Sequence, residues 1–159
     1  MRSPFKLHII FVFTLIYHTI YSDGQGILRF QNLTVNEGLS MGSITGFEKD
    51  SKGFIWMGTA EGLHRYDGQN FNIFKHTENE PNSLSDSYVT CLVSYQKKLF
   101  IGNNIGTIDI LDEENYTFSH INLKSADPSF DNAIEQLIIY QDLIIIDTDG
   151  GGLWQLDTK

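Results

Sequence analysis

Short apolar runs alternate with turn residues along most of the chain. Runs of about four to eight residues, rich in β-branched and aromatic types and bounded by Gly, Asn or Asp, are typical of β-strands. The pattern predicts strands at residues 43–50, 54–58, 61–67, 70–76, 88–95, 99–103, 106–112, 116–123, 133–140, 143–147 and 151–157. The turns at 50–53 and 67–68 supply Gly where hairpins need a positive φ, whereas 96–98 and 141–142 make turns without Gly.

The strand pattern repeats along the chain. The segments EGLHRYD, GTIDILD and GGLWQLD end at Asp67, Asp112 and Asp157, which lie 45 residues apart. Four short strands in a unit of this length are the signature of β-propeller blades, whereas strand-built solenoid repeats usually have a shorter period. The sequence therefore predicts an all-β fold, a partial β-propeller of about three four-stranded antiparallel blades. Their predicted bounds are 37–78, 79–124 and 125–159, and the third is incomplete because no fourth strand follows.

An export signal is predicted at the N-terminus. Arg2 and Lys6 precede an uncharged, mostly apolar run at 7–21, and a small Ser22 follows it. This order is that of a secretory signal peptide, here residues 1-22. An uncleaved membrane anchor is the alternative, but the run is shorter than the roughly 20 residues that span a bilayer. Residues 23-36 are predicted to form a linker that could also supply a ring-closing strand.

Composition narrows the classes of partner. Hydrophobic residues make up 41% of the chain, which is enough for a packed core. The formal net charge of −9 opposes contact with phosphate-rich partners, so neither nucleic acid nor an anionic lipid surface is expected. A neutral sugar or a protein is compatible with this charge. Cys91 is the single cysteine, and its apolar neighbours predict an inert, buried thiol.

The first predicted blade carries a specific motif. Residues 36–71 read NEGLSMGSITGFEKDSKGFIWMGTAEGLHRYDGQNF. This segment closely resembles the two-component regulator propeller repeats in the N-terminal periplasmic sensor region of Bacteroidetes-type hybrid histidine kinases. The matching positions are Gly38, Leu39, Ser40, Asp50, Gly53, Ile55, Trp56, Gly58, Thr59, Gly62, Leu63, Tyr66, Asp67, Gly68 and Phe71. The later blades match less well, with Phe100 and Ile145 near the Trp place and Asn103 in place of Thr.

The resemblance implies a fragment of a sensor. It implies a non-catalytic periplasmic domain whose intact protein senses oligosaccharides, is anchored in the inner membrane and signals to a histidine kinase. The kinase domain is absent from this chain, so no enzymatic activity is expected. The implied partners are a carbohydrate ligand and either the remaining propeller blades or another chain. Two alternatives stay open: an exported β-propeller enzyme acting on polysaccharide, and a propeller scaffold that assembles from identical chains.

No catalytic, cofactor-binding or metal-binding residue is predicted. Asp147 and Asp149 resemble the opening of a calcium loop, but the third ligand and the later bidentate acid are missing, so a turn between strands is the better interpretation. His64, His76 and His120 show no metal-ligand spacing and are interpreted as structural or surface residues.

Two further patterns in the sequence have the residue types that chemistry could use. Residues 38–42 fit the string Gly-x-Ser-x-Gly, but a strand rather than a helix follows Ser40, so no nucleophile elbow is predicted. Aromatic side chains could stack on a sugar face; the candidates are Trp56, Trp154, Tyr66, Tyr88 and Phe71. Packing between blades is favoured for both tryptophans. The ligand-binding residues are therefore left unassigned.

Overall fold

Every run with the strand pattern folds as a strand in the computed structural model, which describes residues 28–127, 129 and 132–159. The strands are β1 (Gly46–Lys49), β2 (Ile55–Thr59), β3 (Gly62–Tyr66), β4 (Phe71–Phe74), β5 (Val89–Tyr95), β6 (Lys98–Asn103), β7 (Thr107–Asp112), β8 (Phe118–Asn122), β9 (Ile134–Tyr140), β10 (Leu143–Thr148) and β11 (Gly152–Asp157). Two short 3-10 helices are η1 (Val35–Glu37) and η2 (Leu123–Ser125). Residues from Leu33 onward form one unit, and the fold is that of this unit.

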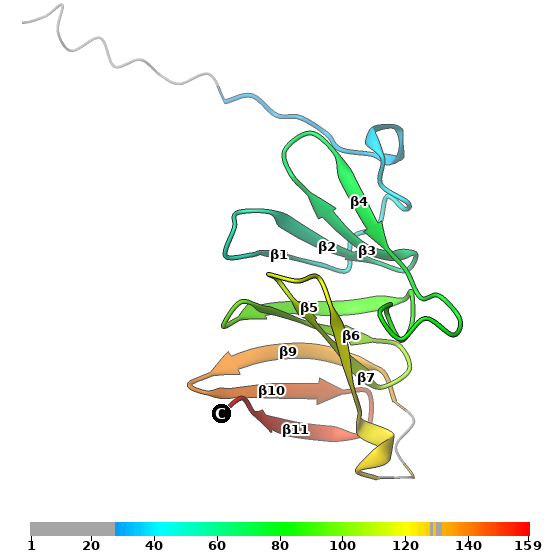
Figure 1. Ribbon diagram of the computed structural model, residues 1–159, viewed down its shortest axis with the longest axis vertical. Helices are drawn as coiled ribbons and strands as arrows, with labels where there is room; N and C mark the ends of the chain where they lie inside the picture. Colours follow the sequence, from blue (N-terminus) through cyan, green and yellow to red (C-terminus); the bar gives the residue numbers. More distant parts are fainter. Residues whose placement is uncertain (1–27, 128, 130–131) are drawn as a thin grey trace, which may run out of the picture. The chain divides into compact units, whose positions relative to one another are not determined.

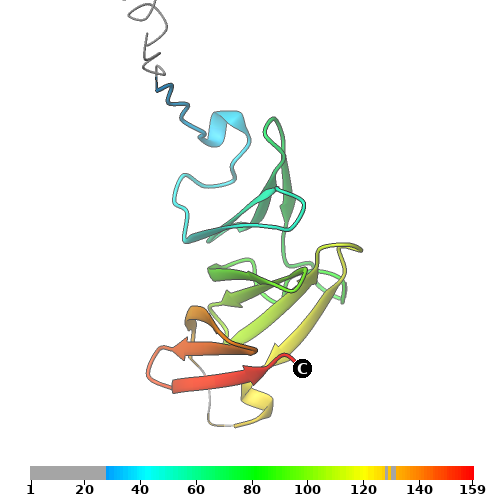
Figure 2. The same cartoon turned by 90° about the vertical axis from the view of Figure 1, so that its left-hand side faces the viewer.

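The strands form three antiparallel sheets in chain order (Figure 1). We call them blade 1 (β1–β4), blade 2 (β5–β8) and blade 3 (β9–β11). Within each blade, every strand pairs with the next one along the chain. Strands β1 and β2 contact β5, and β5 and β6 contact β9, so the sheets follow one another face to face (Figures 1 and 2). The predicted fold class is confirmed, with two four-stranded blades and a third of three strands.

The repeated aspartates begin the turn after the third strand of each blade. The Oδ1 atom of Asp67 accepts the backbone N–H groups of Gln69 and Asn70, at 2.8 and 2.7 Å. Asp112 accepts the equivalent two N–H groups at 2.8 and 2.9 Å, and Asp157 accepts that of Lys159 at 3.0 Å. These backbone hydrogen bonds lower the pKa of Asp67 and of Asp112. The 45-residue period is therefore a period of turn-capping carboxylates.

The tight turns follow the predicted division between those with and without glycine. Gly53 and Gly68 have φ values of +93° and +100°, as their hairpin positions require. In the turns without glycine, Gln96, Lys97 and Gln141 adopt positive φ values of 49°, 60° and 57°. Residues other than glycine rarely adopt this left-handed backbone conformation. The paired strands on either side therefore stabilise these turns.

The core lies between the blades. Trp56 and Leu63 of blade 1 are fully buried against blade 2 residues such as Leu99. The second cluster joins blade 2 to blade 3 and includes Val93, Phe100, Ile108, Leu137, Ile144 and Ile146. Alternate residues of a strand point to opposite faces, so each strand of blade 2 supplies both clusters.

Two polar contacts also join blade 1 to blade 2. Glu113 is fully buried, and its carboxylate accepts hydrogen bonds from the Ser51 N–H and Oγ–H and from the Ser94 hydroxyl, at 3.1, 2.6 and 2.8 Å. The guanidinium of Arg65 lies 4.6 Å from the Phe54 ring centre and 4.7 Å from that of Tyr116. A buried carboxylate with three donors, and a cation between two ring faces, fix the angle between the blades as well as their separation.

Glycine allows close approach at one place in each junction. Gly58 and Gly102 take the same position in β2 and β6, opposite Gly46 and Cys91. A Cβ atom on Gly102 would lie 2.5 Å from Cys91 Sγ and 2.6 Å from a methyl carbon of Ile134 in the next blade. Any side chain at these glycines would therefore push the inner strands of neighbouring blades apart.

The N-terminal predictions and blade boundaries stay predictions. The proposed signal peptide, residues 1-22, lies outside the described residues. Residues 28–34, the described part of the predicted linker before η1, have no assigned secondary structure. Within the ranges 28–127, 129 and 132–159, no helix is long and apolar enough to cross a membrane.

Candidate functional site

The segment that connects β4 to β5 lines an open cavity of about 300 Å³. Its lining includes His76, Thr77, Asn79, Glu80, Ser85 and His120. Hydroxyl, amide, carboxylate and imidazole groups thus meet on one side of the blade 1–blade 2 junction. We call this cavity the crossing site.

Local hydrogen bonds shape the connecting segment. Ser83 is buried, and its hydroxyl accepts the Thr77 N–H at 3.1 Å and donates to the Glu80 carbonyl at 2.8 Å. His76 Nδ1 lies 2.7 Å from the Leu84 carbonyl. The Leu84 side chain is 1% exposed and packs into the core between the blades. The segment is therefore anchored at its centre, which leaves Asn79 and Glu80 facing the cavity.

A Ser–Asp–His cluster fixes the other side of the crossing site. Asp109, on β7, is fully buried, and its two carboxylate oxygens accept the Ser85 hydroxyl at 2.5 Å and the Ser85 N–H at 2.9 Å. His120, on β8, places Nδ1 2.7 Å from Asp109 Oδ1 and Nε2 3.0 Å from the Pro81 carbonyl oxygen. The cluster ties the connecting segment to the outer strands of blade 2.

The geometry around His120 favours a protonated ring. Nδ1 faces Asp109 Oδ1 and, at 3.1 Å, the Ser85 hydroxyl, and Nε2 faces the Pro81 carbonyl oxygen. Because the carboxylate and the carbonyl are acceptors, a proton on each nitrogen lets the ring donate to both. Burial lowers the pKa of His120, but the hydrogen bonds to the Pro81 carbonyl and to Asp109, together with the Asp109 charge, outweigh it and raise the pKa above its ordinary value. His120 and Asp109 thus form an ion pair that depends on pH.

We expect stability to fall as the pH rises through neutrality, in part because of His120. A histidine whose pKa is raised on folding contributes fully below its unfolded value of about 6.5, and the contribution is lost as the pH rises through the raised folded value. His120→Gln should flatten this part of the stability profile, measured by urea unfolding at several values from about pH 6 to 8.5. Lys49→Gln, which removes an exposed charge on β1, is the control. An unchanged slope in His120→Gln would contradict the assignment.

In blade 1 the equivalent serine also donates its backbone N–H to a buried side chain, but the acceptor is a histidine instead of an aspartate. The Ser40 N–H donates to Nε2 of the buried His64 at 3.0 Å, and these residues precede Ser85 and Asp109 by 45 positions. Accepting this hydrogen bond requires Nε2 to be unprotonated. Burial lowers the pKa of His64 below its ordinary value. His64 is therefore a neutral, structural histidine, as the sequence predicted.

Neither serine is arranged as a catalytic nucleophile. At Ser40 the backbone N–H, not the hydroxyl, contacts the imidazole. At Ser85 the hydroxyl donates to Asp109 and lies 3.1 Å from His120 Nδ1, the same nitrogen that contacts Asp109, whereas Nε2 faces the Pro81 carbonyl. In a nucleophilic triad the serine contacts one ring nitrogen and the carboxylate contacts the other. The cluster therefore serves to position the loop.

The aromatic candidates differ in accessibility. Trp56 is 0% exposed, and its Nε1–H donates to Asp50 at 2.9 Å, so it packs between blades as predicted. Trp154 is partly buried against the blade 2–blade 3 core. Tyr66 stacks on Phe71 at 4.7 Å between ring centres and donates its hydroxyl to the Gly68 carbonyl.

Cys91, Asp147 and Asp149 lie away from the crossing site. Cys91 is buried, and burial raises its pKa to about 11, which confirms the prediction of an inert thiol. Asp147 and Asp149 lie at the end of β10 and in the turn before β11, and no cluster of metal-ligating side chains occurs in the described parts of the chain.

The sequence did not single out Asp109, Ser85 or Glu113. One signal for the first two was available: Ser85 and Asp109 repeat the spacing of Ser40 and His64. The contacts of Glu113 with Ser51 join residues 62 apart and follow no local pattern.

Comparisons with known proteins agree on the fold. No protein-family model matches the chain. A solved extracellular domain from a hybrid two-component system of B. thetaiotaomicron superposes on 81% of this chain with a TM-score of 0.64 and 21% identity. A domain from a second such system of the same organism superposes on 80%, with a TM-score of 0.51 and 21% identity. At this identity the likeness shows the fold.

A sequence match points the same way. Over 56 residues, 35% of this chain, the sequence is 36% identical to "Histidine kinase P4" of Formosa agariphila. The chain spans 4% of that protein, and 17% and 25% of the two solved domains. The resemblance predicted from the first blade is thus confirmed in both the sequence and the structural neighbours.

Proposed function

We propose that the chain is a segment of an exported, non-catalytic sensor domain of a hybrid two-component regulator. The observation that carries this proposal is its agreement in fold with extracellular domains of such systems over about four-fifths of its length, 80% and 81%. The match to a histidine kinase supports the same class. The intact protein would lie in the periplasm, be anchored in the inner membrane and supply further propeller blades.

Oligosaccharide is the ligand class we propose for the intact domain. Sugars are recognised by several hydroxyl, amide and carboxylate groups converging on one open surface, with bridging water where contacts are long. The crossing site offers this combination with Asn79, Glu80 and Thr77. A net charge of −9 suits a neutral ligand better than an anionic one.

Calorimetric titration of the chain with a panel of neutral oligosaccharides tests this assignment. We expect heat of binding from at least one member, and Glu80→Ala should weaken it about tenfold, since a charge-assisted hydrogen bond is lost. Glu78→Ala is the matched control, because Glu78 is a nearby carboxylate that does not line the cavity. Equal loss of affinity in both variants would show that the oligosaccharide responds to the local negative charge and not to the crossing site. No heat of binding with any oligosaccharide of the panel would contradict the proposed ligand class.

A further inference from the structure

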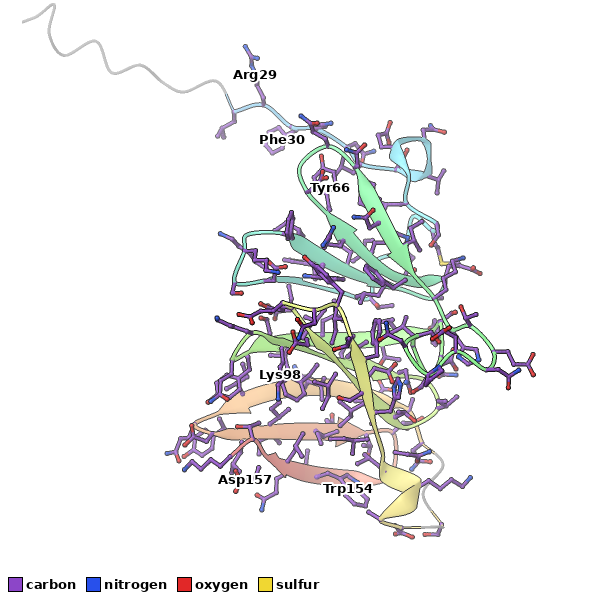
Figure 3. The ribbon with its side chains drawn as sticks, in the orientation of Figure 1. Arg29, Phe30, Tyr66, Lys98, Trp154 and Asp157 are labelled. Atoms are coloured by element: carbon purple, nitrogen blue, oxygen red, sulfur yellow. The ribbon has the colours of Figure 1, made fainter. Side chains whose placement is uncertain are left out.

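The connecting segment between β4 and β5 is held against the outer strand of blade 2 by two neighbouring contacts. The Asn82 side-chain oxygen accepts the Phe118 N–H at 2.8 Å, and the Pro81 carbonyl oxygen lies 3.0 Å from His120 Nε2. In Figure 3 the segment is the green loop that follows β4 and extends beyond the sheets. The two contacts are next along the chain to residues 79–80, so they hold the part of the segment that faces the crossing site.

These two contacts respond differently to pH. The Asn82 amide and the backbone N–H that it accepts do not titrate near neutrality, whereas the His120 ring does. A protonated ring donates to Asp109 and to the Pro81 carbonyl at once, but a neutral ring has one N–H and donates to only one of them. Hydrogen bonds to a charged group are the stronger kind, so the remaining proton stays on Nδ1 beside Asp109. Nε2 then presents a lone pair to the Pro81 carbonyl, and that contact is lost.

The titratable groups that contact His120 or line the crossing site come from two elements, within the residues that the structure describes. They are Asp109 on β7, and His76 and Glu80 on the connecting segment. On β8 itself the adjoining residues, Ser119 and Ile121, carry no charge. Although burial lowers the pKa of His120, the hydrogen bonds to Pro81 and Asp109 and the Asp109 charge raise it overall. The ring therefore loses its charge as the pH rises through neutrality.

Blade 1 holds the segment that precedes it without a charged ring. By strand pairing, His64 takes the place of Asp109 in blade 1, and Ile73 takes the place of His120. The Ser40 N–H donates to the neutral His64 ring, and this contact survives a rise in pH because it requires an unprotonated nitrogen. Of the two four-stranded blades, it is therefore blade 2 whose preceding segment is tied down through a proton.

We propose that the charge on His120 holds the connecting segment over the crossing site in mildly acid solution, and that loss of this charge releases residues 77–82 as the pH rises through neutrality. Leu84 stays in the core between the blades, so the release is local. Asn79 and Glu80 lie within the released part and lose their alignment at the cavity. A ligand of the crossing site then binds more tightly in mildly acid than in mildly alkaline solution. This last step rests on the proposed function, whereas the movement of the segment does not.

Hydrogen exchange of the full chain without ligand tests the movement. Exchange of residues 76–86 is followed by mass spectrometry between about pH 6 and 8.5 and is divided by the intrinsic rate at each pH. Protection should fall about tenfold across this range, because a charge-assisted hydrogen bond is lost. The turn beside Lys98, which Figure 3 labels, lies at the other end of β5 and is the internal reference. Protection of residues 76–86 that stays constant with pH would overturn the proposal.

Two substitutions separate the charge from the contact. His120→Gln keeps a polar side chain that does not titrate, so the protection of residues 76–86 should no longer change with pH. Asn82→Ala is the matched control, because it removes the neighbouring contact with β8 and no titratable group. It should lower the protection at every pH and keep the fold-change of the parent. The parent's fold-change in His120→Gln would overturn the proposal. Should His120→Gln not fold, the ring of His120 is titrated by NMR in the parent, and a midpoint that differs from that of the exchange would overturn the proposal.

Calorimetry with a neutral oligosaccharide tests the link to binding. A neutral ligand has no charge that titrates, so a change of Kd with pH must arise in the protein. The Kd at pH 8.5 should be about tenfold higher than at pH 6, and the difference should disappear in His120→Gln. A Kd that does not change with pH would overturn the link between the segment and the site. If no oligosaccharide binds while the exchange still depends on pH, the proposed function fails and the movement of the segment is supported.

Discussion

Trp56→Ala is expected to lower the free energy of unfolding by about 3–5 kcal/mol, the largest effect of any single truncation in blade 1. Trp56 is 0% exposed and contacts both Phe74 of its own blade and Tyr116 of the next. Its removal leaves a cavity at the junction and deprives Asp50 of the indole N–H. The cavity and the lost hydrogen bond both lower the free energy of unfolding. The cavity persists because the two sheets beside it would have to tilt to close it.

Urea unfolding monitored by far-ultraviolet circular dichroism measures the change. Phe47→Ala is the control, since this aromatic residue of the same blade is 75% exposed and should change stability by less than about 0.5 kcal/mol. Trp56→Phe should fall between them, because it keeps most of the apolar contact and loses the hydrogen bond. Equal losses for Trp56→Ala and Phe47→Ala would show that the junction contributes little to stability.

Gly102→Val should cost about 3 kcal/mol or more, through crowding and not through a cavity. The first carbon of a side chain at Gly102 meets Cys91 and Ile134 at separations no real contact shows, and the two further methyl groups of valine add to the conflict. Ile134 belongs to blade 3, so β9 must shift away from β6. The predicted result is a lower melting temperature and earlier exposure of the blade 2–blade 3 core.

Gly42→Val is the matched control for this substitution. A Cβ atom on Gly42 meets nothing within 4 Å, and this position does not require a positive φ. Its expected effect is within about 0.5 kcal/mol. The test compares the melting temperatures of the two variants and the parent, measured at one protein concentration. If Gly42→Val proved as damaging as Gly102→Val, close approach at the junction would not be the cause.

The sequence was sufficient for the strands, the turns and the period because each depends on near neighbours. Asp67 caps its turn by accepting N–H groups from residues two and three positions away, so this role can be predicted from a few neighbouring residues. Gly53 and Gly68 occupy turns whose geometry demands them. Trp56 was correctly assigned to packing because the repeat placed it on a strand.

The crossing site and the junction contacts could not be predicted in this way. Asp109 meets Ser85 across 24 residues and His120 across 11, and both contacts depend on how the connecting segment folds back over blade 2. The raised pKa of His120 depends in part on the hydrogen bond to the Pro81 carbonyl, which no spacing rule places beside it.

Placing the apolar clusters between the sheets, and not inside each one, makes the molecule behave like a short linear array. Blade 2 is stabilised by two neighbours, whereas in the described residues blades 1 and 3 each share a cluster with blade 2 alone. Nearest-neighbour coupling of this kind lets an array fray from its ends while its centre holds. Amide protection against hydrogen exchange should therefore be graded by position, highest in β5 and β6 and lowest in β4 and β11.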